Sequence, residues 1–486
     1  MTSRELLALA VPIVPAVTAA LAVLAPRRAI AAIGLVGAVS SGLVAVAFAV
    51  VALASADDPI AGDWLVVDAA SGLFVGVIGV VGLASALTSP AYLGAARTEL
   101  VRPERVPRLY WGALLAFWAV LAAVPLAGNL GIAWLLIEAT TAASALLVGF
   151  TGRAPALEAG WKYLVLTTVG LGFALLGIVL IAPEVEGGLG GLSWGSLASI
   201  DEGSEQLSVA FVLLLAGLAA KVGWAPVHNW LPDAHSEAPP PVSALLSSAL
   251  LPAVLVVAWR ADTALAPAVG EELAQWILVG FGLASLAVAV PFLWRSLPCK
   301  RLLAYSSLEH MGVLALGFAF ATPLAMAGVV IHVAGHALAK ALGFYAATPL
   351  LSQFPNAAGR QATGVGRTAP ALGATMGISL GTLAGLPPSP LFASEVLIVA
   401  GGFEAGLEWV AVATAVLLSL GFLGLGHALI EVIAGRTRRH ATEPPTGLRS
   451  LMALTLAATV ALLALTALAP WLPGSEIVEA LLDGVA

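Results

Sequence analysis

The sequence predicts an all-α integral membrane protein with about fourteen transmembrane helices. Its 486 residues are 60% hydrophobic and only 10% charged, and the mean hydropathy is +1.00. A soluble domain carries about 25% charged residues, so this chain lacks the polar surface that water would require. The apolar runs last about 20 residues and do not alternate, which favours helices over the strands of a membrane barrel.

Fourteen segments of the chain are apolar and long enough to cross a bilayer. We expect transmembrane helices near residues 5–25, 29–54, 68–88, 107–127, 130–150, 160–182, 208–235, 240–261, 271–294, 301–321, 324–351, 370–402, 407–435 and 450–471.

The positions of the Lys and Arg residues support this number of spans. Of the 21, 17 fall in one set of alternate loops, whereas only Arg4 and Arg260 fall on the opposite side and Lys221 and Lys340 lie inside spans. The positive-inside rule places the rich side in the cytoplasm and both termini outside it. We therefore expect a multi-pass protein of a prokaryotic plasma membrane.

The seventh and twelfth spans are expected to be broken by proline. Pro226 and Pro232 interrupt the seventh span, and Pro387, Pro388 and Pro390 interrupt the twelfth. Proline removes a helical hydrogen bond, and a membrane tolerates this where protein or a water-filled cavity satisfies the freed backbone. Because the two breaks lie five spans apart and near charged residues, we predict two inverted five-helix repeats, spans 4–8 and 9–13.

The whole chain, residues 1–486, is expected to form a single membrane domain. We divide it into N-terminal helices (1–106), a first repeat (107–261), a second repeat (271–435) and a C-terminal helix and tail (450–486). The loops are too short and polar to bury a core of their own. The single cysteine, Cys299, excludes a disulfide framework or an iron–sulfur cluster held by this chain alone, and we expect no cofactor in it.

Charged residues inside the spans are the candidate functional residues, because a charge at mid-bilayer costs a few kcal/mol or more. An alternative is that they only hydrogen-bond neighbouring helices and hold the bundle together. The candidates for a proton relay are Glu138, Lys221, Glu309, His310, His332, His336, Lys340 and Glu395.

The eleventh span carries the most regular of these residues. His332, His336 and Lys340 follow at i, i+4 and i+8, so they form one polar stripe roughly 12 Å long on one helical face. Such a stripe can hand protons along, with water filling the gaps. Two His at i, i+4 could instead bind a metal, but we predict no metal site, because no Glu or Asp follows at helical spacing.

Polar residues near the cytoplasmic end of the seventh span could admit protons to this path. They are His228, Asp233, His235 and Glu237. Equally, Asp233 and the prolines could simply cap and end a helix. Asp68, near the start of the third span, is expected to be a cap.

Residues Lys221–Arg260 read KVGWAPVHNWLPDAHSEAPPPVSALLSSALLPAVLVVAWR. This segment resembles the signature of the proton-conducting, antiporter-like membrane subunits of respiratory complex I, a family shared with multi-subunit cation/proton antiporters and membrane-bound hydrogenases. Residues 304–312 (AYSSLEHMG) and 386–395 (LPPSPLFASE) resemble component F of hydrogenase-4-type complexes more closely, through the Glu309-His310 pair. The resemblance extends over most of the chain.

The resemblance implies a proton-translocating membrane subunit of a redox-driven, hetero-oligomeric complex. Other membrane subunits and a peripheral redox module, with iron–sulfur clusters and a nickel–iron or related centre, would be its partners, together with the lipid bilayer. It further implies that Glu138 and Lys221 form a pair whose separation weakens the lysine's hold on its proton. We expect no active site in this chain itself and no nucleic-acid partner, and either H⁺ or Na⁺ could be the ion.

Two other functions stay open from the sequence. One is a subunit of a cation/proton antiporter or ion-coupled uptake system without a redox partner, and the other is a scaffold that conducts nothing. The point in favour of the scaffold is the eighth span, where several complex I relatives carry a lysine and this chain has Ser247, Ser248 and Pro252. A proton would have to pass this place through water or by way of the eleventh span.

Overall fold

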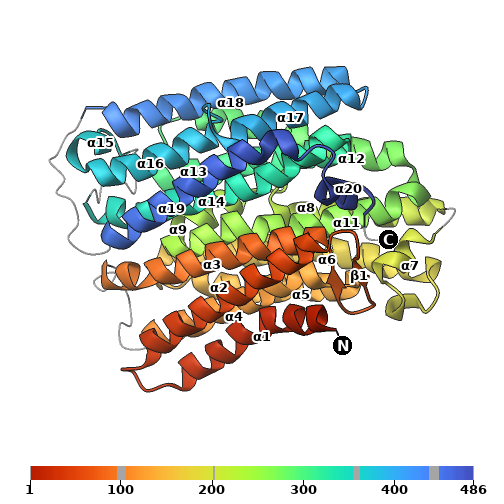
Figure 1. The fold of residues 1–486 in the computed structure, drawn as a ribbon, viewed down its shortest axis with the longest axis horizontal. Helices are drawn as coiled ribbons and strands as arrows, with labels where there is room; N and C mark the ends of the chain where they lie inside the picture. Colours follow the sequence, from red (N-terminus) through yellow and green to blue (C-terminus); the bar gives the residue numbers. More distant parts are fainter. Residues whose placement is uncertain (1, 96–105, 201–202, 354–361, 437–447, 485–486) are drawn as a thin grey trace.

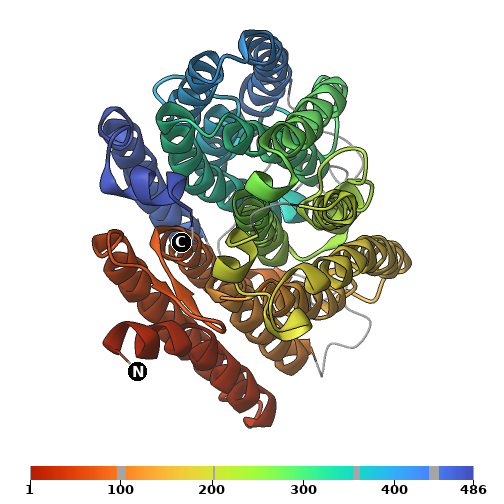
Figure 2. The ribbon, with the colours of Figure 1, turned by 90° about the vertical axis from the view of Figure 1, so that its right-hand side faces the viewer.

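The computed structural model describes residues 2–95, 106–200, 203–353, 362–436 and 448–484. Its helices run nearly parallel, and both ends of the chain lie at the same end of the bundle (Figure 1). Seen along the helices, the N-terminal helices flank a larger group formed by the rest of the chain (Figure 2). Of the Lys and Arg residues used to predict the orientation, Arg97, Arg102, Arg105, Arg360, Arg438 and Arg439 lie outside the described residues.

Within the described residues, thirteen helices are long and apolar enough to span a bilayer. A fourteenth span is split between two shorter helices, α16 (Pro370–Leu383) and α17 (Pro390–Glu404). The predicted number of spans is therefore confirmed. The unbroken spans are α1 (Ser3–Leu24), α2 (Ile30–Ala54), α3 (Ala69–Ala95), α4 (Val106–Ala123), α5 (Leu130–Val148), α6 (Ala154–Ile181), α10–α11 (Pro240–Leu245 and Leu251–Val269), α12 (Glu271–Leu293), α13 (Cys299–Phe320), α14 (Pro323–Gln353), α18 (Glu408–Ala434) and α19 (Leu448–Leu468).

Both predicted breaks are present. The seventh span is α8 (Glu205–Val222) followed, after the loop 223–230, by α9 (Leu231–Glu237). Pro226 lies in this loop and Pro232 in the first turn of α9, while Pro387 and Pro388 lie in the loop before α17, which Pro390 begins. Proline at the start of a helix costs no hydrogen bond, so these residues end one half-helix and begin the next.

The structure also contains short strands and helices at the two ends of the bundle. They were not predicted, because the length of apolar runs reveals only the membrane spans. Strands β1 (Ile60–Ala61) and β2 (Val66–Val67) form a hairpin between α2 and α3. Helix α7 (Trp194–Ala198) lies between α6 and α8, helix α15 (Val365–Thr368) before α16, and helix α20 (Glu476–Leu482) near the C-terminus. Short 3-10 turns at 124–126, 182–184, 188–190 and 469–471 end or connect the spans.

Small residues let equivalent helices approach closely in the two predicted repeats. In the first, a Cβ on Gly217 of α8 would lie 2.5 Å from the Gly170 carbonyl of α6. In the second, a Cβ on Gly328 of α14 would lie 2.8 Å from the Ser394 carbonyl of α17. Such contacts drive helix association in lipid, where burial of apolar surface gives little. These glycine contacts bring the broken span of each predicted repeat against the span before it. The division into repeats itself stays a prediction.

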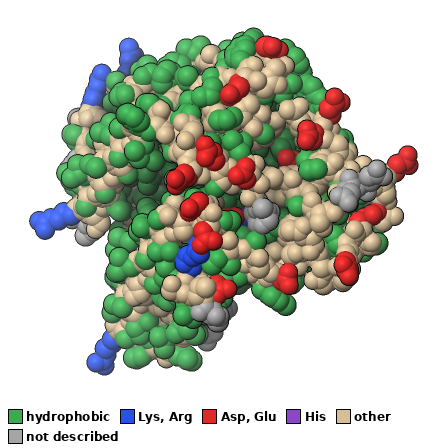
Figure 3. Space-filling view, turned by 45° about the vertical axis from the view of Figure 1, so that its right-hand side comes forward, with side chains coloured by type: hydrophobic (Ala, Val, Ile, Leu, Met, Phe, Trp, Pro, Cys, Tyr) green, Lys and Arg blue, Asp and Glu red, His purple; other side chains and the backbone are tan. Residues whose placement is uncertain are grey.

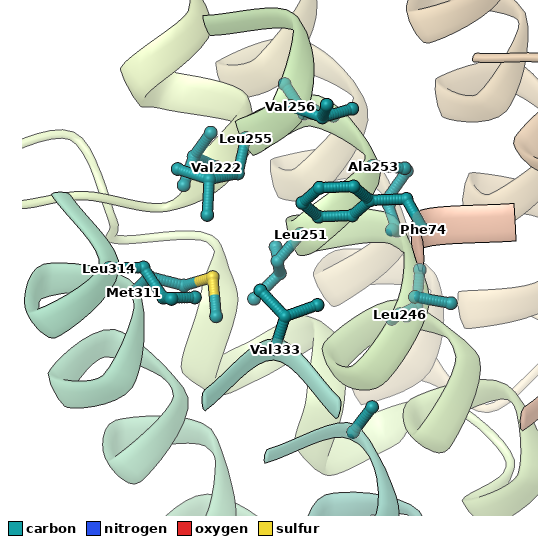
Figure 4. Packing of buried hydrophobic residues seen from close by; sticks show 14 of the residues in the cluster. Phe74, Val222, Leu246, Leu251, Ala253, Leu255, Val256, Met311, Leu314 and Val333 are labelled. Carbon is teal, nitrogen blue, oxygen red and sulfur yellow. The ribbon is translucent and has the colours of Figure 1, made fainter. Parts of the chain in front are cut away.

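The eighth span lies at the centre of the molecule and is buried throughout residues 240–261. Side chains of α11 such as Leu251 pack among Val222 of α8, Met311 of α13 and Val333 of α14 (Figure 4). Large apolar side chains on the outer helices are instead exposed, for example Leu146 at 68% and Trp161 at 66%. This inverted distribution fits a protein whose surrounding solvent is lipid.

Charge is segregated between the two ends of the molecule. In Figure 3 most Lys and Arg side chains lie at one edge, whereas Asp and Glu side chains gather over the opposite end. Asp68 caps α3 as predicted, since its carboxylate accepts a 2.6 Å hydrogen bond from the Ser71 amide. Arg260 lies inside the structure, because α11 extends to Val269, beyond the predicted end at residue 261.

Candidate functional site

Seven Lys, His and Glu side chains of the described residues are almost completely enclosed in the bundle. Glu309 is 3% exposed, and the others have no exposed surface at all. Burying so many titratable groups costs free energy unless each is hydrogen-bonded or serves a function. The residues enclosed together with Glu309 are Lys221, His235, His310, His332, His336 and Lys340.

Lys221, one turn after Gly217, projects from α8 toward α5 and α6. Its amine donates hydrogen bonds to the Thr141 hydroxyl (2.7 Å) and to the Tyr163 hydroxyl (2.5 Å). Ser144 donates to the Thr140 carbonyl, so its oxygen accepts the proton of the Tyr163 hydroxyl at 2.7 Å. These bonds form a directed chain from the amine into α5.

Glu138 does not contact Lys221 directly. Its carboxylate accepts a 2.9 Å hydrogen bond from the Thr168 hydroxyl of α6, and its side chain is half-buried. In the part of the chain that the structure describes, no ion pair joins Lys221 to a carboxylate. The contact pair expected from the resemblance is therefore absent from this conformation, and Thr141, one turn beyond Glu138 on α5, occupies the position next to the amine.

His235 lies in the interior, which corrects its assignment to the cytoplasmic end of the path. It is fully buried, its ring stacks on Phe344 of α14 at 5.6 Å, and it lies 6.4 Å from the Trp230 ring. Trp230 in turn packs against Tyr163 at 4.8 Å. His235 is also close enough to Lys340 and His336 to interact with them electrostatically. It thus lies between the Lys221 site and the eleventh span.

The other three candidates for proton uptake occupy two different places. Asp233 pairs with Arg301 (3.1 Å) and Lys162 (3.6 Å), and Glu237 pairs with Arg153 (3.7 Å). These bridges join the ends of α6, α9 and α13 at one surface, and α9 has no side-chain cap, so Asp233 does not serve as one. His228 lies half-buried in the loop that breaks the seventh span, and it takes no part in these bridges among the described residues.

Lys340 is held on α13 by two acceptors. Its amine donates a 2.6 Å hydrogen bond to the Leu303 carbonyl and a second one to the Ser306 hydroxyl. The neighbouring Ser307 exchanges a 2.7 Å hydrogen bond with Ser247 of the eighth span. Ser307 also donates to the Leu303 carbonyl, so this carbonyl and Ser307 connect the lysine to the central helix.

The predicted stripe on α14 is part of a three-histidine cluster. His310 of α13 and His332 of α14 face each other with 3.2 Å between Nδ1 and Nε2, and the rings of His310 and His336 lie 5.2 Å apart. Both nitrogens of His336 and one oxygen of Glu309 have no hydrogen-bond partner within the described ranges. Such groups require water or a ligand, since orphaned buried polar atoms are costly.

Glu395 connects this cluster to the outer surface. It is half-buried on α17, next to Ser394, and lines a groove of about 740 Å³ between α17 and α18. Apolar side chains such as Phe392 and Val396 form most of the groove. One ligand atom each from Glu395, His310 and His332 lie within 4.8 Å of one another. The expectation of no metal site relied on spacing along one helix. These three residues come from three helices, so spacing along the sequence could not reveal that they lie close together.

The eighth span contains a π-helical turn, Leu246–Leu250, at the place where the resemblance to complex I subunits suggests a lysine. Pro252 lacks an amide proton and follows this turn, and insertions of this kind often mark functional positions. Ser247 and Ser248 are buried here, and the Ser248 hydroxyl has no partner among the described residues. The place is polar although it holds no titratable group.

Hydroxyl side chains around the two lysines, Glu138 and His332 are functional candidates that were not predicted from the sequence. They are Thr141, Ser144, Tyr163, Thr168, Ser306 and Ser394. Their signal in the sequence is weak, because Ser and Thr are common in membrane helices and usually bond their own backbone. Only Thr140, Thr141 and Ser144, which cluster one turn after Glu138, stand out.

Comparison with known proteins identifies relatives over most of the chain. Residues 127–421 match the family model described as NADH:quinone oxidoreductase/Mrp antiporter, transmembrane region. The chain is 32% identical to a hydrogenase-4 component F homolog of Methylacidiphilum infernorum, over 78% of this chain and 80% of the relative. It is 29% identical to the NADH-quinone oxidoreductase subunit N of Desulforudis audaxviator, over 73% and 70%.

Solved structures share the fold along nearly the entire chain. A subunit of the membrane-bound sulfane sulfur reductase, an archaeal respiratory membrane complex, is similar with a TM-score of 0.85 at 20% identity, covering 98% of this chain and 97% of that one. A chain of the Mrp complex from Dietzia sp. gives 0.83 at 20% identity, covering 100% and 98%. A chain of respiratory complex I from Thermus thermophilus gives 0.81 at 22%, covering 99% and 100%.

Proposed function

Because this chain belongs to the NADH:quinone oxidoreductase/Mrp antiporter transmembrane family, we propose that it is a proton-translocating membrane subunit of a redox-driven, hetero-oligomeric complex. One observation carries the proposal. Two buried lysine sites, Lys221 and Lys340, lie on either side of buried His235, and the second continues through three histidines to Glu395. A scaffold would gain nothing from enclosing so many titratable groups.

The side chains of this row favour the proton as the ion. Na⁺ is bound by oxygen ligands, whereas the amines of Lys221 and Lys340 only donate hydrogen bonds and cannot coordinate a cation while protonated. Imidazoles accept and release protons near neutral pH. The row alternates such groups with hydroxyls, which pass protons by reorienting.

In the proposed path, a proton reaches Lys221 from the cytoplasmic surface near Asp233 and Glu237. It moves by way of water and His235 to Lys340, and then through the histidine cluster to Glu395. A positive charge placed near Glu138 by a neighbouring subunit would act on Lys221 through space. It would disfavour the protonated amine and make the lysine release its proton. Moving one charge against 100 mV costs about 2.3 kcal/mol, which sets the coupling energy that each proton requires.

The partners are inferred from the relatives. We infer that other membrane subunits and a peripheral redox module assemble with this chain in a prokaryotic plasma membrane, with both termini outside the cytoplasm. Iron–sulfur clusters and a nickel–iron or related centre would belong to the module, because this chain offers only Cys299, a buried thiol at the start of α13. The likeness to the Mrp chain supports a second candidate, a cation/proton antiporter subunit without a redox partner.

Purification from the native membrane in mild detergent, with identification of co-purifying subunits and assay of nickel and iron, separates the two candidates. Recovery of hydrogenase-like and iron–sulfur subunits with metal supports the redox-driven complex. Recovery of only small membrane subunits without metal supports the antiporter.

Proton flow in vesicles containing the isolated complex tests the conduction path. Lys221→Ala is expected to abolish most of the flow, whereas Arg4→Ala, which breaks a pair with Asp58 and lies on α1, a helix that contributes no residue to the path, is expected to leave it unchanged. Flow that survives Lys221→Ala in full would overturn the assignment.

A further inference from the structure

We propose that His310, His332 and Glu395 form a binding site for a divalent transition-metal cation of the Zn²⁺ type. The three residues come from α13, α14 and α17, and one ligand atom of each lies within 4.8 Å of the other two. Zn²⁺ sites with two His and one Glu and an open fourth position are a known coordination class. The binding inference is independent of proton conduction, whereas its consequence for transport rests on the proposed function.

The spacing of the two imidazoles fits one tetrahedral ion. His310 Nδ1 and His332 Nε2 lie 3.2 Å apart. With Zn–N bonds of about 2.0–2.1 Å, two ligands of a tetrahedral ion are separated by about 3.3–3.4 Å. The two nitrogens are therefore already close to that separation, and rotation of the rings would direct both lone pairs at one ion. Glu395 must close a longer gap, which its flexible side chain can do by rotation, since one side of it lies in the groove between α17 and α18.

A hydrogen bond behind His332 orients it for this role. The Ser394 hydroxyl donates its only proton to the Leu391 carbonyl at 2.8 Å, so toward His332 it acts as an acceptor. The 2.9 Å contact with His332 Nδ1 is thus an N–H···O bond. Neutral His332 then carries its lone pair on Nε2, the atom that faces His310. Metal-binding histidines are commonly fixed by such a bond from the other ring nitrogen.

The local charge also suits a divalent cation. Glu395 provides one negative charge as a ligand, and Glu309 is close enough to Glu395 to interact with it electrostatically. One oxygen of Glu309 has no hydrogen-bond partner among the described residues. The Glu395 and Glu309 carboxylates together oppose the +2 charge of the ion and the positive charge of Lys340, which also interacts with Glu309. The imidazoles disfavour Mg²⁺ and Ca²⁺, which prefer oxygen ligands.

A bound ion would occupy the place where His310 and His332 exchange a hydrogen bond. In the proposed path this contact precedes Glu395, so the ion would block proton flow at the last buried step. The site would therefore make transport sensitive to zinc.

Zinc binding to the isolated complex can be measured with Zn²⁺ alone, by calorimetry and by X-ray absorption. We expect a coordination shell with two imidazoles and at least one carboxylate oxygen. Glu395→Gln, at a half-buried position, keeps the packing and is expected to weaken binding at least tenfold. His332→Gln should weaken it similarly. The control is His427→Gln, which removes an exposed His paired with Glu431 and should leave the buried site intact.

The outcomes distinguish this inference from the proposed function. Zinc binding that Glu395→Gln does not weaken, or that His427→Gln abolishes, overturns the buried site. Binding that depends on Glu395 without inhibition of proton flow establishes the site and contradicts the path through it. Loss of both binding and inhibition in Glu395→Gln, measured on the flow that remains, supports both.

Discussion

Lys221 of α8 donates a hydrogen bond to Tyr163 of α6, although the two residues are 58 positions apart. Tyr163 is itself enclosed, and its hydroxyl donates a hydrogen bond to the Ser144 oxygen. The amine is therefore held by hydroxyls, with Glu138 acting on it only through space. A lysine held by neutral partners keeps its charge at a cost, and this makes its proton easier to displace than in a direct ion pair.

The variant Tyr163→Phe tests this arrangement. It removes one of the two acceptors of the Lys221 amine and the connection to Ser144, so we expect proton flow to fall about tenfold, the effect of roughly 1.4 kcal/mol. Initial rates of acidification in vesicles measure it. Tyr305→Phe is the matched control, because Tyr305 is also buried but stacks on Phe292 at 4.1 Å. Equal rates in the two variants would contradict a role for the Tyr163 hydroxyl.

The interior position of His235 leads to a second prediction. If His235 links the two lysine sites, His235→Phe should stop proton flow while leaving the complex assembled, since an aromatic ring can still stack on Phe344. Glu237→Gln, two residues further on, breaks a half-exposed bridge to Arg153 and removes one of the two carboxylates near the proposed uptake surface, but Asp233 remains, so we expect only a small reduction in flow. The opposite result, a large loss in Glu237→Gln and none in His235→Phe, would exclude His235 as the link between the two lysine sites.

The sequence was sufficient for those features that depend on local signals. Span length follows from runs of apolar residues, and the two breaks follow from Pro226 and the Pro387-Pro388 pair, because proline acts on its own backbone. The stripe of His332, His336 and Lys340 followed from helical periodicity. These predictions required no knowledge of how the helices pack.

The remaining features depend on contacts between distant segments. His235 was misplaced because sequence position near a span end says nothing about the direction in which α9 turns. The approach of Glu395 to His310 and His332 combines three helices and depends on the glycines that let α14 and α17 touch. The hydroxyl partners of the lysines were missed for the same reason, since a serine in a membrane helix has no distinctive neighbours in sequence.

Gly421 of α18 gives a third prediction, through its close contact with Glu309. A Cβ at this position would lie 1.8 Å from Glu309 Oε1, so Gly421→Ala must displace the carboxylate. We expect slower proton flow, because Glu309 lies beside Lys340 and the histidines. Gly426→Ala on the same helix is the control, since its Cβ would meet nothing within 4 Å. Proton flow equal to that of the unchanged protein in Gly421→Ala would exclude Glu309 from the path.

The ion pair between Asp68 and Arg260 is expected to control stability rather than transport. Arg260 Nη2 lies 2.8 Å from the Asp68 carboxylate, and Arg260 Nη1 donates to the Pro125 carbonyl at 2.7 Å, so this buried residue joins α3, α11 and the end of α4. Removing one partner leaves a buried charge uncompensated, which costs about 3–5 kcal/mol. Asp68→Asn should therefore lower the unfolding midpoint of the protein in detergent by several degrees.

The comparison is Arg4→Ala, which breaks the more exposed Arg4–Asp58 pair and should shift the midpoint little, because exposed pairs contribute about 0–1 kcal/mol. Equal shifts in the two variants would mean that the buried pair contributes no more than the exposed one. A normal midpoint with lost proton flow in Asp68→Asn would instead place this pair on the transport path.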